Sequence, residues 1–465
     1  MTFDNLSNNR STAVETFIAD WLTQHRIPGA AVAIVDADGD PSVSAEGFGA
    51  RTLETNTPVT ADTLFGVGSC TKPFTATAIM QLVEAGDLAV DDPVSEYLPH
   101  LADAPGDLIT IEELLTHTSG MPSDGAAGPL ITRWLGVGGG EIPLSSEADF
   151  RRHVQGSTDR RVTDRDTFFY YNSGYIMLGQ IIEQITGQDF STYVEEEILA
   201  PLGMDRATFD QDAFEADSNR MTPYMKQEGA STEAGFPFDP LIHPAGGLIA
   251  SVRDLAKYMQ GVFGGTALGA DRVVTAKSLE MMTKHVGSLS AYFDGQDLGY
   301  GYGFMMQEFL DDRWIGHGGS IGVSTAWFGY LEDADVGVAV ACTTSPETRP
   351  MDAGMAVMGL LQDKTPETVQ PHYRLMSTLE AVTGKYAGYR NTMGASVERV
   401  GGGLKIEVDG AVGGQELLLT PTRIEDDLLV CTTVTAAGME REIRFEFGDG
   451  NVDLFVGRLR LRHAA

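Results

Sequence analysis

The segment that most constrains this chain is the tetrad from Ser69 to Lys72 (Ser-Cys-Thr-Lys), which opens the apolar run from Phe74 to Val83. The run predicts a helix that ends at Gly86, a residue suited to a left-handed cap. Pro73 is compatible with this helix, because a proline in the first turn removes an N–H that has no partner there. A serine and a lysine three positions apart share one face of the turn, so the amine can contact the hydroxyl.

This spacing indicates a serine nucleophile that is activated by a neighbouring amine. Of all the lysines in the chain, Lys72 alone has a serine three residues before it, so the sequence offers one candidate. The first turn of the helix also exposes unpaired backbone N–H groups and the positive end of the helix dipole. These groups would stabilise an oxyanion formed on a substrate at Ser69.

A nucleophile also needs groups that carry its proton, and the sequence Tyr170-Tyr171-Asn172 supplies candidates. It precedes a periodic apolar segment, residues 176–185, that predicts a helix. The phenol of Tyr170 can relay a proton, and the amide of Asn172 can hold both a lysine ammonium and a substrate carbonyl. Tyr389 and Asn391 repeat the pattern, but they fall late in the chain, in what we predict to be a separate domain.

The sequence His317-Gly318-Gly319 follows residues that predict a strand. Its glycines would let the backbone of a substrate lie against the edge of a sheet without a side chain in the way. The N–H of Ser320 would then be a second oxyanion donor beside that of Ser69. His285 and Gly287 repeat the His-x-Gly pattern, but they follow a segment with helical periodicity.

In this order, the motifs resemble those of the penicillin-recognising serine hydrolases, in the branch that holds class C β-lactamases, DD-carboxypeptidases, D-aminopeptidases and esterases of the β-lactamase fold. Five further segments match the family: residues 28–35, 111–120, 201–204, 244–248 and 254–256. The resemblance covers about residues 12 to 362. It implies that the chain is a serine hydrolase.

Carried over residue by residue, the resemblance implies that Ser69 is the acylated nucleophile and that Lys72 and Tyr170 handle its proton. Which of these two takes the first proton stays open, because coupled groups share their titration. Asn172 would anchor the substrate and the lysine. His317, Gly318 and Gly319 would form the substrate-binding strand.

One departure from the family concerns His317, which stands where many β-lactamases and carboxypeptidases carry a lysine. A fixed cation attracts a substrate carboxylate, whereas a histidine is partly charged near neutral pH. This difference favours small esters and D-residue or small peptides as substrates, with β-lactams as a side activity. The alternative is a binding, sensor or assembly protein that keeps the fold without significant turnover. The complete set of site residues favours the enzyme.

The chain is strongly acidic, with 66 acidic residues against 32 basic ones and a formal net charge of −34. This charge excludes nucleic acid and anionic membrane surfaces as partners. The excess of acids, spread along the chain, resembles the composition of proteins from halophiles, in which high salt screens the repulsion. The alternative is an acidic enzyme of a mesophile. In a halophilic archaeon without peptidoglycan, a role in cell-wall trimming would be excluded.

No signal peptide or membrane span is predicted, because residues 1–10 are polar and no apolar run approaches the roughly 18 residues that a span needs. We therefore expect a cytoplasmic protein. The cysteines Cys70, Cys342 and Cys431 are few and widely separated, so neither a disulfide framework nor a zinc site is predicted. His117 and His243 are interpreted as structural. We expect no metal and no cofactor.

The predicted fold class is α+β, in two domains. Residues 1–363 would form a two-lobed hydrolase domain, in which an antiparallel sheet and a helical insertion meet at the cleft. We expect the sheet to contain a hairpin around residues 37–40 and strands at 302–306, 313–317, 324–330 and 336–342. The segment 136–140 is interpreted as a flexible glycine loop.

A linker, residues 364–371, is predicted to lead into a small antiparallel β domain, residues 372–465. Five segments of that domain alternate apolar and polar residues, with a turn at 448–451. The domain resembles the lipocalin-like appendage found in some family members, including self-compartmentalising archaeal peptidases. It would restrict access to the cleft, mediate a homo-oligomer or simply add stability.

Overall fold

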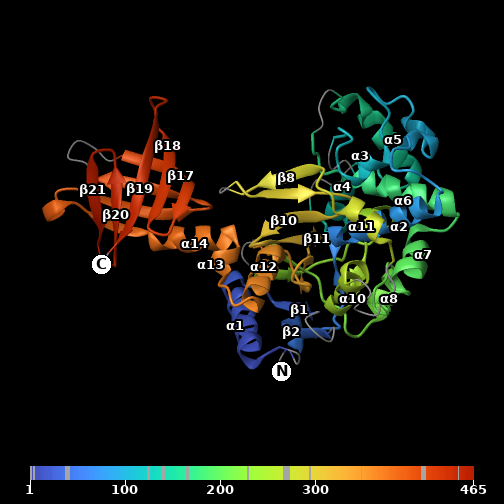
Figure 1. Ribbon diagram of the computed structural model, residues 1–465, viewed down its shortest axis with the longest axis horizontal. Helices are drawn as coiled ribbons and strands as arrows, with labels where there is room; N and C mark the ends of the chain where they lie inside the picture. The colour runs from blue at the N-terminus through green and yellow to red at the C-terminus, as the bar shows by residue number, and fades with distance from the viewer. Residues whose placement is uncertain are drawn as a thin grey trace. The chain divides into compact units, whose positions relative to one another are not determined.

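The computed structural model describes residues 3, 6–36, 42–122, 126–137, 142–163, 167–227, 230–264, 273–292, 295–346, 348–409, 415–448 and 450–464. The chain divides into two compact units (Figure 1). The first comprises Met1–Ser290 and Asp297–Asp363, and the second comprises Ala291–Gln296 and Lys364–Ala465. The predicted α+β class is confirmed, with a sheet and helices in the first unit and an antiparallel barrel in the second.

The first unit is built on a nine-stranded sheet in the order β3-β2-β1-β13-β12-β11-β10-β9-β8. Its strands are β1 (Gly29–Asp36), β2 (Ser42–Thr52), β3 (Thr57–Pro58), β8 (Gly287–Ala291), β9 (Asp297–Tyr300), β10 (Met305–Phe309), β11 (Asp312–Ser320), β12 (Thr325–Leu331) and β13 (Val336–Cys342). β1 pairs antiparallel with β13, so the start and the end of this unit's sequence meet in one sheet. The hairpin turn predicted around residues 37–40 lies outside the described residues.

Helices cover both faces of this sheet. Trp327 of β12 packs against Gly354 of α12 (Pro350–Leu361), where a Cβ would lie 2.1 Å from the indole ring. The next residue, Phe328, packs edge-on against Tyr258 of α10 (Val252–Phe263). Because successive strand residues point to opposite faces, α12 and α10 cover opposite faces. Figure 1 shows α12 beside α1 (Asn8–His25), which it contacts.

The expected helical insertion lies between β2 and β8 in the sequence. Its elements are η1 (Gly68–Thr71), α2 (Lys72–Ala85), α3 (Ile111–Leu115), α4 (Ala127–Trp134), α5 (Glu147–Ser157), α6 (Asn172–Thr186), α7 (Phe190–Val194), α8 (Gln211–Ala216), α9 (His243–Gly246), α10 and α11 (Ala276–Met282), with the short strands β4 (Phe65–Gly66), β5 (Tyr224–Gln227), β6 (Ala230–Glu233) and β7 (Ile249–Ala250). α2 ends at Ala85, and Gly86 caps it with a positive φ of 81°, as predicted. Of the glycine loop, residues 138–140 lie outside the described residues.

One expected strand of the sheet is displaced along the sequence. We expected a strand over residues 302–306, whereas β10 begins at Met305. Gly301 and Phe304 close a turn through a backbone hydrogen bond of 2.9 Å, and Gly303 within it has a positive φ of 74°. Glycine adopts this conformation readily, so the chain turns before the strand begins.

The second unit is a closed antiparallel barrel of eight strands. They are β14 (Gly384–Ala387), β15 (Gly394–Val400), β16 (Gly403–Asp409), β17 (Gln415–Glu425), β18 (Leu428–Val434), β19 (Glu440–Gly448), β20 (Asn451–Val456) and β21 (Leu459–His463). Buried residues such as Ile406, Phe445 and Leu454 fill its core. β14 pairs with β21, so both terminal strands of the sheet have partners.

The sequence pattern predicted five of these strands and missed β14, β15 and β17. It also predicted a linker where the structure has the short helix α13 (Pro366–Val369), followed by α14 (Pro371–Ala381). Both helices begin with proline, which suits the first helical position although it breaks a helix interior. Within the turn predicted at 448–451, residue 449 lies outside the described residues.

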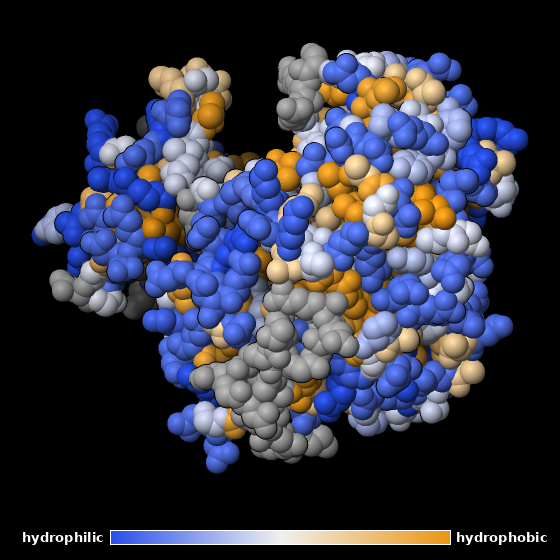
Figure 2. Space-filling model, turned by 45° about the vertical axis from the view of Figure 1, so that its right-hand side comes forward, coloured by the Kyte–Doolittle hydropathy of each residue, from blue (hydrophilic) through white to orange (hydrophobic). Residues whose placement is uncertain are grey.

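Hydrophilic side chains cover most of the face shown in Figure 2, with small apolar areas between them. In the chain as a whole, acidic residues outnumber basic ones by about two to one, and charged side chains lie mostly at protein surfaces. Within the part of the chain that the structure describes, no helix combines the length and apolar character that a membrane crossing requires.

Candidate active site

Ser69 lies on the 3-10 turn η1, and Lys72 is the first residue of α2. The predicted helix therefore starts with a tighter turn, in which side chains three positions apart lie directly above each other. Thr71 anchors this turn: its hydroxyl donates to the Gly68 carbonyl at 2.7 Å and accepts from the N–H of Leu248 at 3.1 Å. The nucleophile and the amine are thus presented on one fixed face.

The side chain of Lys72 is fully buried, and three oxygens surround its amine. Nζ donates to Oγ of Ser69 at 3.0 Å, to Oδ1 of Asn172 at 2.8 Å and to the carbonyl of Ala245 at 2.7 Å. A lysine ammonium has three protons, so these acceptors match it one for one. The predicted contact of Lys72 with Ser69 and with Asn172 is present.

Tyr170 lies two residues before α6, and Asn172 is the first residue of that helix. Nζ of Lys72 lies 4.8 Å from the centre of the Tyr170 ring and 5.3 Å from that of Tyr175. The negative faces of aromatic rings stabilise a buried cation. The structure thus brings Ser69, Lys72, Tyr170 and Asn172 together from two separate segments.

The strand β11 contains the other predicted residues and passes beside Ser69. β10 pairs with residues 312–316 of β11 and, among the described residues, this pairing stops before His317. A Cβ on Gly319 would lie 2.0 Å from the carbonyl oxygen of Val67 and 2.5 Å from the N of Ser69, so a glycine is required there. A Cβ on Gly318 would meet nothing closer than 3.6 Å.

The reason for a glycine at position 319 therefore differs from the expected one. The sequence predicted that both glycines leave room for a substrate, but Gly319 leaves room for the backbone of η1. A Cβ on Gly68 would similarly lie 2.5 Å from the N of Ser320. The two N–H groups predicted as oxyanion donors, those of Ser69 and Ser320, thus lie on closely packed segments.

His317 is fully buried, and its ring lies behind the strand. Nε2 contacts the hydroxyl of Tyr300 at 3.0 Å, and Nδ1 contacts the carbonyl of Gly318 at 2.5 Å. Burial, together with the positive charge of Lys72, lowers the pKa of His317 to about 3. The ring is therefore neutral at neutral pH and supplies no cation to a substrate.

A cleft of about 400 Å³ opens beside the nucleophile. Ser69, Tyr170, Gly318, Gly319 and Ser320 line it, whereas Lys72, Asn172 and His317 lie behind these residues. The other lining residues are mostly apolar or small: Leu289, Leu298, Met305, Thr325, Ala326, Trp327, Ser345, Pro346, Thr348, Pro350 and Met351, with Arg349 as a cation. Such a cleft suits a partly apolar ligand with few polar groups.

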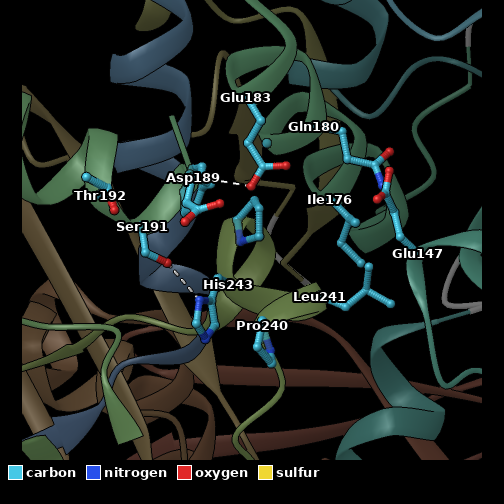
Figure 3. Close-up of a pocket in the computed structure, with 13 residues that line it drawn as sticks. Glu147, Ile176, Gln180, Glu183, Asp189, Ser191, Thr192, Pro240, Leu241 and His243 are labelled. Carbon is cyan, nitrogen blue, oxygen red and sulfur yellow. Dashed lines mark hydrogen bonds between the residues drawn. The ribbon is translucent and has the colours of Figure 1, made fainter. Parts of the chain in front are cut away.

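A second pocket, of about 370 Å³, lies beside α6, α7 and α9 and shares no lining residue with the cleft (Figure 3). In it, Nδ1 of His243 hydrogen-bonds Oγ of Ser191 at 2.8 Å, and burial lowers the pKa of His243 to about 4. Oγ1 of Thr75 donates to the carbonyl of Pro244 at 2.7 Å. These contacts hold α9, which carries the Ala245 carbonyl that accepts from Lys72.

The sequence did not predict four features of the site. They are the carbonyl of Ala245, Arg349 in the cleft, and the side chains of His117 and Tyr300 behind it. The segment 111–120 matched the family, which was the available signal for His117. Among the described residues, no cluster of three or more histidine, cysteine or acidic side chains is arranged to hold a metal ion.

Residues 13–361 match the model of the beta-lactamase family, and the chain belongs to this family. Penicillin-binding protein 4 of Amycolatopsis lactamdurans is 30% identical over 317 residues, which are 66% of this chain and 78% of that protein. Esterase EstB of Burkholderia gladioli is 35% identical over 198 residues, which are 39% of this chain and 47% of the esterase. The match therefore spans about half of that esterase.

Residues 366–462 match the model of the Pab87 octamerisation domain. The octameric penicillin-binding protein homologue from Pyrococcus abyssi has a similar structure, with a TM-score of 0.86 and 33% identity over 97% of this chain and 99% of that chain. A D-stereospecific amidohydrolase from Streptomyces sp. shares the fold, with a TM-score of 0.59 and 23% identity over 71% of this chain and 94% of that chain.

Proposed function

We propose that this protein is a serine hydrolase that cleaves ester or amide bonds through an acyl-enzyme on Ser69. One observation carries the proposal: the buried amine of Lys72 lies 3.0 Å from the hydroxyl of Ser69, and that serine lines an open cleft. Relatives that include an esterase and a penicillin-binding protein support this reaction class.

In this reaction, Oγ of Ser69 forms a bond to the carbonyl carbon of the substrate, and its proton passes to the pair Lys72 and Tyr170. To accept this proton, the pair must hold one proton fewer than an ammonium beside a phenol: either Lys72 is a neutral amine, or Tyr170 is a phenolate beside the Lys72 ammonium. The N–H groups of Ser69 and Ser320 stabilise the oxyanion. When the intermediate collapses, the pair returns the proton to the leaving oxygen or nitrogen. Water then attacks the acyl ester and releases the carboxylic acid and the free serine. Asn172 orients Lys72 and the substrate carbonyl.

The substrates we propose are small esters and peptides that are short or contain D-residues, with β-lactams as a side activity. A neutral His317 supports this choice over a dedicated β-lactamase, because it offers no charge to a carboxylate. Among the described residues that line the cleft, Arg349 is the cation, and it forms a 2.8 Å ion pair with Asp352. A substrate carboxylate would have to compete with Asp352 for it.

Two further proposals concern the whole chain. The match to an octamerisation domain and the similarity to an octameric homologue support a homo-oligomer that forms through the barrel. We propose residues 372–465 as the limits of the barrel domain. The net charge of −34 supports a protein adapted to high salt. The resemblance of the barrel to a lipocalin-like domain remains a prediction from its strand pattern.

The decisive experiment measures the hydrolysis of p-nitrophenyl acetate, nitrocefin and D-alanyl-p-nitroanilide by the wild type and by Ser69→Ala, in molar potassium chloride and in dilute buffer. We expect turnover by the wild type and a loss of at least about a thousandfold in the variant, with unchanged folding and mass. Folded wild-type protein that hydrolyses none of the three would favour the alternative, a binding, sensor or assembly protein. Turnover that persists in Ser69→Ala would exclude the mechanism.

A further inference from the structure

Three polar side chains that no step above uses lie in contact behind the cleft. They are His117, which follows α3, Tyr300 at the end of β9, and His317 in β11. His117 is 1% exposed, and the other two are 0% exposed. Buried polar groups are expensive unless each is hydrogen-bonded, so their arrangement is informative.

The contacts among them form one chain of hydrogen bonds with a defined direction. The backbone N–H of Tyr171 can only donate, so Nδ1 of His117, at 3.0 Å, is the acceptor. In a neutral imidazole the proton is then on Nε2, which lies 3.2 Å from the hydroxyl of Tyr300 and donates to it. Tyr300 in turn donates to Nε2 of His317 at 3.0 Å.

The last bond leaves the proton of His317 on Nδ1, which donates to the carbonyl of Gly318 at 2.5 Å. A backbone donor at one end and a backbone acceptor at the other therefore determine every proton position between them. Both rings must be neutral for this order to hold. Burial and the charge of Lys72 lower the pKa of each of them, which is consistent with neutral rings.

The two ends of this chain of hydrogen bonds contact the two segments that flank Ser69, the tyrosine segment 170–172 and the strand β11. Tyr171 lies between Tyr170 and Asn172, and Gly318 is the first of the three residues of β11 that line the cleft beside Ser69. His117 holds the tyrosine segment in two further ways. Its carbonyl accepts from the N–H of Phe169 at 2.8 Å, and its ring centre lies 4.3 Å from that of Tyr170.

The backbone of His117 supports a role that exceeds filling space. Its φ is 60°, in the left-handed region that residues with a Cβ rarely occupy, because it is strained for them. The surrounding hydrogen bonds impose this conformation, and it aims both the ring and the carbonyl at the tyrosine segment.

We propose that His117 and Tyr300 are positioning residues. One directed chain of hydrogen bonds runs through these two side chains and His317. It holds Tyr170 and the strand from Gly318 to Ser320 in the arrangement that acylation of Ser69 requires. This inference rests on the proposed function. The chain links the helical insertion to the sheet, so it joins two parts of the site that the backbone does not connect directly.

The substitution Tyr300→Phe tests the proposal, because it removes one hydroxyl and keeps the ring. We expect the rate of acylation and kcat to fall at least about tenfold, with KM within about twofold of the wild type. The matched control is Tyr258→Phe, which removes a buried hydroxyl of α10 that hydrogen-bonds Thr77 at 2.9 Å. The control should lose similar stability and keep kcat.

A second variant, His117→Asn, removes the imidazole ring. Asparagine is chosen because it tolerates the left-handed backbone conformation at this position. If both side chains act in one chain, the double variant should be no slower than the slower single variant. Multiplied losses in the double variant would show independent roles. A kcat of Tyr300→Phe equal to that of Tyr258→Phe would overturn the inference and leave the proposed function intact.

Labelling of Ser69 by a fluorophosphonate separates the two proposals. If the wild type is labelled but hydrolyses no substrate, the proposed turnover fails, and the labelling rates of the variants still test the positioning. If the wild type is not labelled, crystal structures of the wild type and of Tyr300→Phe decide. Displacement of Tyr170 or of residues 318–320 supports the inference, and unmoved positions overturn it.

Discussion

Lys72 brings a positive charge into a fully buried position, and its neighbours compensate for it in two ways. Three oxygens accept its hydrogen bonds, and the rings of Tyr170 and Tyr175 lie near its amine. The nearby imidazoles of His117 and His317 stay neutral, because burial and the charge of Lys72 lower their pKa values. A buried charge is tolerated only with such partners. The residues around Lys72 therefore compensate for one positive charge, that of the lysine itself.

His243 gives a pH dependence of stability outside the site. Its pKa is about 4 in the folded protein, against an unfolded value near 6.5, so unfolding between these pH values takes up a proton. Its contribution is therefore complete above pH 6.5 and is lost as the pH falls toward 4. We expect His243→Gln to reduce the slope of unfolding free energy against pH by about 1.4 kcal/mol per pH unit in this window.

Urea unfolding at pH 7, 6 and 5 measures this slope. The measurement belongs in molar potassium chloride, where salt screens the repulsion among the acidic residues that a lower pH would relieve. Equal slopes for the wild type and the variant would show that His243 is protonated in the folded protein.

At the scale of elements, the site depends on the close approach of η1 and β11. Gly319 permits this approach because a Cβ would lie 2.0 Å from a backbone oxygen of Val67, which cannot move as a side chain does. We expect Gly319→Ala to separate the two elements, to destabilise the fold by about 1–3 kcal/mol and to lower the acylation rate at least about a hundredfold.

Gly318→Ala is the matched control, because its Cβ would make ordinary contacts of 3.6 Å or more. Thermal unfolding and labelling of Ser69 measure both variants. We expect Gly318→Ala to fold and to be labelled nearly as the wild type is. Equal behaviour of the two alanine variants would mean that the approach of η1 and β11 does not govern acylation.

Elements with a strong local signal were predicted well, and others were not. Gly86 caps α2 as expected, the continuous apolar run of β13 indicates a buried strand, and the alternation of residues in β16 indicates a half-buried one. β14 has four residues, too few for a clear pattern. Residues 364–371, which contain the prolines that begin α13 and α14, were predicted to be a linker. The sequence pattern also did not predict the strands β8 and β9, which contribute Leu289 and Leu298 to the lining of the cleft.

At the scale of the whole molecule, the net charge of −34 opposes the compact state, and salt weakens this repulsion. We expect the unfolding temperature to rise by about 10 °C between 0.1 and 2 M potassium chloride. Sucrose at matched osmolality is the control for effects that do not depend on charge. An unfolding temperature that is insensitive to salt would contradict the proposed adaptation to high salt.

Sedimentation of the full chain in the same salts tests the proposed homo-oligomer. The octameric homologue and the matched octamerisation domain lead us to expect a mass near eight chains of 49.9 kDa in molar salt. Subunits that each carry a large negative charge should associate more weakly in dilute buffer. A monomer at every salt concentration would contradict this proposal.

The sequence by itself determined the features that depend on neighbours along the chain. The three-residue spacing from Ser69 to Lys72, the Tyr-x-Asn segment before α6 and the alternation in the barrel are local patterns with local causes. Together with the family resemblance, they predicted the fold class and four residues that the structure brings together: Ser69, Lys72, Tyr170 and Asn172.

The tertiary structure alone decided which distant groups complete the site. Ala245 accepts from Lys72 across 173 residues of sequence, and His117 meets Tyr300 across 183. No local pattern encodes these contacts, because they depend on which faces of the helical insertion and the sheet pack together. The charge of His317 was likewise decided by the tertiary structure. Burial, a property of the folded chain, makes its ring neutral behind the strand, so it offers no positive charge to a substrate.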